Sequence, residues 1–127
     1  MSIGQIILAL FSALIVFLYF KKFLLSRSIK QYSASGLKEK MNGGKGSILL
    51  DVRTNAERSS QSLGGSIHIP LNELRNRKVE LKKFKDKEII CYCRSGSRSL
   101  NAAALLRKDG FNAANLTGGL LKYKFNN

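Results

Sequence analysis

The sequence contains a single proline, a single histidine and only two cysteines among its 127 residues. With one proline and 44% hydrophobic residues, the composition excludes an intrinsically disordered chain. Cys91 and Cys93 are one residue apart, which is poor spacing for a disulfide and excludes a disulfide-stapled secreted scaffold. This use of cysteine predicts a reducing compartment. One histidine and two adjacent cysteines predict no metal site, and nothing in the composition calls for a cofactor.

Charged side chains are missing from residues 1–20, although the chain has 22 Lys and Arg against 8 Asp and Glu. The formal net charge of +14 therefore belongs entirely to the remainder of the chain, which excludes a uniformly basic protein. The length allows one compact domain. The chain is thus an uncharged apolar leader joined to a strongly cationic body.

The leader has the length and composition of a membrane-spanning helix. Residues 3–20 carry only three polar side chains, those of Gln5, Ser12 and Tyr19. Eighteen helical residues at 1.5 Å each reach about 27 Å, close to the thickness of a bilayer's hydrocarbon core. A cleaved signal peptide is disfavoured because no Lys or Arg precedes the apolar run and bulky residues end it. A buried core helix is disfavoured by the uniform hydrophobicity. We therefore predict a retained transmembrane anchor over residues 1–25.

Positive charge follows the apolar segment directly, at Lys21, Lys22, Arg27 and Lys30, whereas the N-terminal side carries only the α-amino group. The positive-inside rule predicts a single-pass membrane protein with its C-terminal body in the cytoplasm. This orientation agrees with the reducing compartment that the cysteines indicate. We assign residues 26–33 to a basic juxtamembrane linker.

Strand and helix patterns alternate along residues 34–127, which we assign to one domain. Short apolar runs that turn polar abruptly predict strands at 47–52, 66–69, 88–92 and 112–116. Helices are predicted from Ser33 or Ser35 to Met41, over 72–84 with a break near Lys78, over 97–109, and after Gly119. Because hairpin signals are scarce, this alternation favours an α/β fold with a parallel sheet.

The chemistry is concentrated in the loop between the strand at 88–92 and the helix at 97–109, which reads Cys93-Arg94-Ser95-Gly96-Ser97-Arg98. Ligands bind at this edge of open parallel sheets. Successive backbone N–H groups and the helix N-terminus both favour an anion there.

The residue types of this loop suit a sulfur nucleophile. Arg94 and Arg98 add guanidinium groups that fit oxyanions, and Gly96 can adopt the backbone conformation that a sharp loop needs. A thiol at the first position, Cys93, is predicted to be a thiolate near neutral pH, because its surroundings stabilise negative charge. The loop therefore predicts an activated cysteine nucleophile inside an oxyanion-binding site, with no separate base. The alternative is a buried, inert cysteine beside solvated arginines.

Four segments resemble the rhodanese-like sulfurtransferase family, in the family's order, within residues 34–123. Residues 49–53 (Leu-Leu-Asp-Val-Arg) are similar to its opening strand and Asp-x-Arg signature, and residues 65–70 (Gly-Ser-Ile-His-Ile-Pro) to its Gly-Ala-Ile-Asn-Ile-Pro segment. Residues 92–99 are very similar to its active-site loop, and residues 116–119 (Leu-Thr-Gly-Gly) to its closing Gly-Gly turn. Four such segments in register make the resemblance specific.

The resemblance implies a three-layer α/β domain and a double-displacement sulfur transfer. In that mechanism Cys93 attacks the outer sulfur of thiosulfate or another persulfide donor, and the resulting persulfide passes its sulfur to cyanide or a cellular thiol, which could belong to a protein. Arg94 and Arg98, with the loop residues Ser95, Gly96 and Ser97, would bind the anionic donor and the persulfide. The resemblance implies no cofactor, and it gives Asp51 and Arg53 a structural role.

Three alternatives accompany this interpretation. Phosphatase relatives of the family use a longer Cys-x5-Arg loop, so the Cys93-x4-Arg98 spacing favours sulfur over phosphate. A membrane-tethered sulfur carrier or partner-binding module with little turnover remains the alternative function. Cys91 could resolve an oxidised Cys93 or accept its persulfide, although a cysteine in a buried strand is more often core. His68 is interpreted as structural.

The chain departs from the family pattern at three places that surround the loop. Gln61-Ser62 replaces the family's Gly-His, Arg58 stands where an aromatic is common, and Tyr123 replaces a Trp. These changes affect the rim and the packing, so they bear on the choice of substrate more than on the type of reaction.

A basic cluster between the second and third predicted strands comprises Arg75, Arg77, Lys78, Lys82, Lys83, Lys85 and Lys87. No recognition motif or stacking aromatic accompanies it, so we expect no nucleic-acid partner. A solvated helix face, or attraction to an anionic membrane surface, explains the charge more simply.

Overall fold

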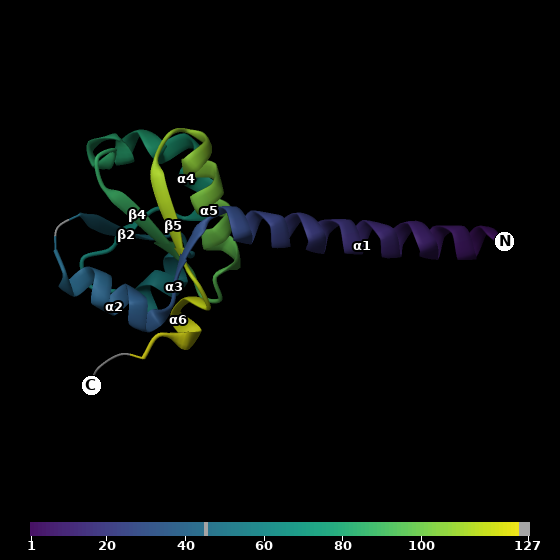
Figure 1. Cartoon of the computed structure of the whole chain (residues 1–127), viewed down its shortest axis with the longest axis horizontal. Coiled ribbons are helices and arrows are strands. Elements are labelled where there is room, and N and C mark those ends of the chain that lie inside the picture. The colour runs from purple at the N-terminus through teal and green to yellow at the C-terminus, as the bar shows by residue number, and fades with distance from the viewer. Residues whose placement is uncertain (45, 125–127) are drawn as a thin grey trace.

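A five-stranded parallel sheet forms the centre of the computed structural model, which describes residues 1–44 and 46–124 (Figure 1). The strand order is β1-β5-β4-β2-β3. The strands are β1 (Lys30–Tyr32), β2 (Ser47–Asp51), β3 (Ile67–His68), β4 (Glu88–Tyr92) and β5 (Asn112–Leu116). The helices are α1 (Ile3–Ser28), α2 (Ala34–Asn42), α3 (Asn55–Ser60), α4 (Leu71–Arg77), the 3₁₀ helix η1 (Lys78–Phe84), α5 (Ser97–Lys108) and α6 (Gly119–Lys122). The predicted α/β fold with a parallel sheet is confirmed.

The strand β4 lies at the centre of the sheet, and all five of its residues are buried. Side chains alternate between the two faces of a strand. Ile89 and Cys91 therefore join a core cluster that includes residues of α4, η1 and α5, whereas Ile90 and Tyr92 join a second cluster with α2 and α6. Two apolar layers on opposite faces of one sheet give the three-layer arrangement.

The helix α1 extends away from the domain (Figure 1). Its 26 residues correspond to about 39 Å of helix, and none of them is buried. By length and composition this helix could cross a membrane. Its C-terminal end is attached to the domain, because Leu25 packs against the first core cluster and the following Ile29 is buried in it.

The segment 26–33, predicted to be a linker, is folded into the domain. The helix α1 continues to Ser28, and β1 pairs in parallel with β5, with Lys30 opposite Ala114 and Tyr32 opposite Leu116. A strand of three polar residues at the edge of a sheet has no hydrophobic alternation, so its sequence carries no strand signal. The folded unit therefore begins before residue 34.

The other predicted elements are confirmed to within one or two residues. The helix α3 was not predicted. Ser33 is the N-cap of α2, and α4 gives way to η1 at Lys78, where the break was expected. The missed helix α3 is six residues long and depends on a capping box between Thr54 and Glu57. So short a helix has no apolar periodicity to reveal it. Residues 125–127 of the predicted domain lie outside the described residues.

The turn between β5 and α6 lies directly against the loop that follows β4. The amides of Leu120 and Leu121 donate to the carbonyls of Cys93 and Arg94, at 3.0 and 3.1 Å. Gly119 has a φ of +58°, and a Cβ added there would clash with the Arg94 carbonyl. Both the backbone conformation and the close approach therefore require glycine.

We expect Gly119→Ala to destabilise the full chain by at least about 2 kcal/mol, because it combines an unfavourable φ with a clash against backbone. The measurement is thermal unfolding in non-ionic detergent, followed by circular dichroism. Gly64→Ala is the matched control, since a Cβ at Gly64 meets nothing within 4 Å, and it should change stability by less than about 0.5 kcal/mol. Equal effects of the two substitutions would contradict the packing argument.

Candidate active site

The loop Cys93–Arg98 leaves the carboxyl end of the central strand β4 and leads into α5. This edge of a parallel sheet is where α/β proteins bind ligands. Gly96 is the N-cap of α5 and has a φ of +100°, which lets the chain turn sharply into the helix. The structure therefore brings the six loop residues that the sequence singled out into one turn around Cys93.

The Cys93 sulfur sits inside a shell of hydrogen-bond donors. Its Sγ accepts from the amide of Gly96 at 3.1 Å, and from the amide and the hydroxyl of Ser99 at 3.4 and 3.3 Å. Cys93 itself is fully buried. An arrangement of donors around one buried sulfur stabilises a negative charge on that atom.

The pKa of the Cys93 thiol is lowered from its ordinary value. Burial alone would raise it, but the hydrogen bonds from Ser99 and from the amides of Gly96 and Ser95 outweigh the burial. The predicted thiolate therefore has a physical basis in the loop and in the first turn of α5. Sequence reasoning did not identify Ser99, although it stands at the next position after the loop motif.

Behind Ser99, a chain of polar side chains connects the loop to β5 and β1. The Ser99 hydroxyl has one proton, which it shares between Cys93 Sγ and Asn115 Oδ1, at 3.3 and 2.5 Å. Asn115 Nδ2 donates to the Gly96 carbonyl and to Gln31 Oε1, at 3.2 and 2.9 Å. Gln31 belongs to the strand that the sequence did not predict. This network fixes the Gly96 carbonyl on the side of β5, where the chain turns into α5.

The two arginines of the loop have different surroundings. Arg94 is exposed at the surface beside the loop. Arg98 is half-buried and donates from Nη1 and Nη2 to the two carboxylate oxygens of Glu57, at 2.7 and 2.8 Å. This hydrogen bond is the main reason that the pKa of Glu57 falls to about 2. The sequence did not predict this ion pair, which joins α3 to α5. Glu57 occupies the guanidinium fork of Arg98 that was expected to bind the donor.

Asp51 anchors a second buried network, on the side of β2 and β3. Its carboxylate accepts from Arg53 Nε and Nη2 at 2.9 Å each and from the Tyr92 hydroxyl at 3.2 Å. Arg58, which replaces the family's aromatic, reaches both Asp51 and Ser66. None of these side chains contacts the Cys93 sulfur, so their placement fits the structural role that the resemblance implies for Asp51 and Arg53.

Cys91 is fully buried and packs in the first core cluster. Burial raises the pKa of its thiol, so Cys91 stays protonated. These surroundings are those of a core residue. Within residues 1–44 and 46–124, no group of three or more His, Cys, Asp or Glu side chains is placed to hold a metal ion.

The basic cluster lies at the other end of α5 from the loop. Lys78 pairs with Asp109, directly after the last residue of this helix, whereas the loop precedes its first residue. Twelve helical residues separate the two ends by about 18 Å. Arg77 is engaged by Glu73 and Glu80, at 3.2 and 2.8 Å. The cluster is therefore not part of the cysteine site.

Comparison with known proteins agrees with this architecture. The rhodanese-like domain family matches residues 33–126. A sulfurtransferase of Allochromatium vinosum is 28% identical over 96 residues, which cover 75% of this chain and 88% of that protein. The Bacillus subtilis protein YtwF is 33% identical over 96 residues, covering 76% of this chain and 91% of that protein. The B. subtilis protein YqhL is 33% identical over 121 residues, covering 94% and 92%, so this alignment extends into α1.

A solved structure gives the same fold. The crystal structure of a rhodanese-like domain protein from Staphylococcus aureus superposes with a TM-score of 0.70 at 24% identity, covering 76% of this chain and 92% of that chain. The fold and the loop together define a three-layer α/β domain with a cysteine in the loop that follows the central strand. The chain belongs to the rhodanese-like family, whose members include sulfurtransferases and sulfur carriers.

We expect Ser99→Ala to raise the pKa of Cys93, because it removes one hydrogen bond to the thiolate and leaves the burial unchanged. Alkylation of Cys93 by iodoacetamide at neutral pH, measured by mass spectrometry, should become several-fold slower in the full chain, and its pH profile should move upward. In the matched control Ser95→Ala, the contributing amide remains, so the profile should not move. A profile that is identical in Ser99→Ala and wild type would show that the hydroxyl does not stabilise the thiolate.

Proposed function

We propose that the chain is a rhodanese-type sulfurtransferase in which Cys93 carries the transferred sulfur. The observation that supports this most directly is the Cys93 sulfur with a lowered pKa, surrounded by donors from Gly96 and Ser99. A thiolate held by dipoles rather than by a fixed cation keeps its negative charge and remains able to attack. The lowered pKa favours the thiolate as the attacking group, so the proposed reaction includes no separate base.

The reaction proceeds in two displacements. The Cys93 thiolate attacks the outer sulfur of a donor such as thiosulfate, the donor's S–S bond breaks, and sulfite leaves with the bonding electron pair. The product is a persulfide on Cys93, whose terminal sulfur carries the negative charge. A thiophilic acceptor, cyanide or a thiolate, then attacks that sulfur, and the S–S bond breaks to regenerate the Cys93 thiolate.

In this proposal the loop residues contribute to donor binding in different ways. The amides of Ser95, Gly96 and Ser97 belong to the turn and to the start of α5, where partial positive charge would favour the donor's anionic end. Arg94, exposed beside the loop, adds a guanidinium that a donor can reach. Arg98 contributes by fixing the loop against Glu57, since that carboxylate occupies its fork.

We expect Cys93→Ser to abolish formation of thiocyanate from thiosulfate and cyanide by the full chain in detergent. Cys91→Ser is the matched control, and it should keep the activity of the folded protein, because Cys91 lies in the core. Equal rates from wild type and Cys93→Ser would contradict the catalytic assignment. A persulfide on Cys93, seen by mass spectrometry without turnover, would instead favour a sulfur carrier, the alternative function.

We further propose that α1 anchors the domain in a membrane, with the domain on the cytoplasmic side. None of the residues of α1 is buried although its composition is apolar, so a soluble chain would expose the whole helix to water. Lys21 and Lys22 follow the apolar residues at the position of a membrane interface, and with Arg27 and Lys30 they favour the cytoplasm.

The full chain should remain with the membrane pellet after extraction with alkaline carbonate, because an apolar spanning helix is not released by removing ionic contacts. Release into the supernatant would contradict the anchor. A variant with three leucines of the apolar segment replaced, Leu8→Lys, Leu10→Lys and Leu14→Lys, is the control and should be released.

A further inference from the structure

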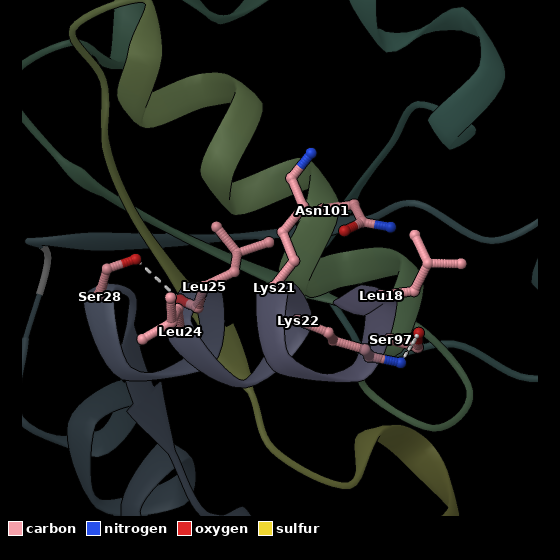
Figure 2. A pocket seen from close by; sticks show the side chains of 8 residues that line it. All are labelled: Leu18, Lys21, Lys22, Leu24, Leu25, Ser28, Ser97 and Asn101. Carbon is pink, nitrogen blue, oxygen red and sulfur yellow. Dashed lines mark hydrogen bonds between the residues drawn. The ribbon is translucent and has the colours of Figure 1, made fainter. Parts of the chain in front are cut away.

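The helix α1 reaches the cysteine loop through one side chain. Lys22 Nζ donates a hydrogen bond to Ser97 Oγ at 2.7 Å, between residues that are 75 positions apart in the chain (Figure 2). Within the described residues, Ser97 is the only hydrogen-bond partner of this ammonium, which has three N–H donors. The family resemblance covers residues 34–123 and so gives no role to this lysine.

Lys22 lines a hollow on the flank of the loop, formed by loop residues together with residues of β1 and β5; Cys93 is not among its lining residues. This hollow has a volume of about 310 Å³, and its walls include Lys22, Ser95, Gly96 and Ser97. The same lysine also borders a cleft of about 510 Å³ between α1 and α5, together with Lys21 and Asn101. Figure 2 shows the Lys22 side chain directed toward Ser97, whereas Lys21 extends along α5 toward Asn101. Lys21 does not line the hollow beside the loop.

The charges around the loop make this cation important. The Arg98 guanidinium is bound in two hydrogen bonds by the Glu57 carboxylate, so the pair contributes little net charge to the site. Arg94 and Lys22 are both exposed, so solvent screens both charges. The hydrogen bond to Ser97 nevertheless holds the Lys22 ammonium on the side of the loop where α5 begins.

We propose that Lys22 of α1 is a donor-binding residue, which holds the anionic end of a small sulfane-sulfur donor and makes the site prefer anionic donors over neutral ones. This inference rests on the proposed sulfurtransferase function for its substrate. The contact with Ser97 places the ammonium at the loop, and its other N–H groups meet an oxyanion that enters the hollow. The class of ligand is a donor with a sulfonate-like or similar oxyanion, such as thiosulfate.

The first experiment compares steady-state sulfur transfer from thiosulfate to cyanide by the full chain in non-ionic detergent. We expect Lys22→Gln to raise the KM for thiosulfate about tenfold while kcat stays close to wild type. Lys22→Arg should restore a low KM, and the matched control Lys21→Gln should resemble wild type. A fall in kcat at unchanged KM, or equal effects of Lys22→Gln and Lys21→Gln, would overturn the inference.

The second experiment does not depend on sulfur transfer. The Cys93 thiolate is alkylated with iodoacetate, which is anionic, and with iodoacetamide, which is neutral and of similar size. Lys22→Gln should lower the ratio of the iodoacetate rate to the iodoacetamide rate several-fold, and salt should reduce this ratio in wild type more than in the variant. A ratio unchanged by Lys22→Gln would overturn the role of Lys22, even if the chain transfers sulfur. A changed ratio in a chain without sulfur transfer would refute the proposed function alone.

Discussion

The structure depends on the contact between two pieces of backbone, the turn at Gly118–Gly119 and the carbonyls of Cys93 and Arg94. The amides that begin α6 hold these two carbonyls. With the carbonyls turned toward α6, the amides farther along the loop can face the sulfur. A side chain at Gly119 would occupy the space of the Arg94 carbonyl. This backbone contact near the end of the domain thus fixes the conformation of the loop around Cys93.

Among the described residues, no charged side chain donates a hydrogen bond to the Cys93 sulfur. Arg98 is paired with Glu57, and Arg53 and Arg58 are directed to Asp51, so the hydrogen bonds to Cys93 come from backbone amides and the Ser99 hydroxyl. Dipoles that are fixed by a folded loop stabilise a thiolate without forming an ion pair that an attack would have to break. The ion pairs instead join α3 and the β3 region to the sheet and to α5, and so keep the dipoles in place.

Most of the fold could be predicted because its central elements carry strong local signals. The buried runs at β2 and β4, and the small apolar face of α5 followed by Gly110, are each patterns that a single segment contains. Three features have no such signal. The strand β1 is short and polar, α3 is one capped turn and a half, and the partner of Arg98 lies 41 positions away. In the same way, the loop motif identified Cys93, but Ser99 and Lys22 become visible only when α5 and α1 are placed around it.

The junction between α1 and the domain determines where the site faces. A flexible linker would let the domain turn freely relative to α1, but Leu25 packs on the core, Ile29 is buried, and Gln31 belongs to the network behind Cys93. The helix and the cysteine loop are therefore held as neighbours by the residues that connect them. With α1 in a bilayer, Lys22 would lie at the interface and the loop would open beside it, within reach of anions that gather at a cationic surface. In that arrangement the anchor would be part of the proposed site, because the turn of helix that leaves the membrane contacts Ser97 of the loop for which we propose donor binding.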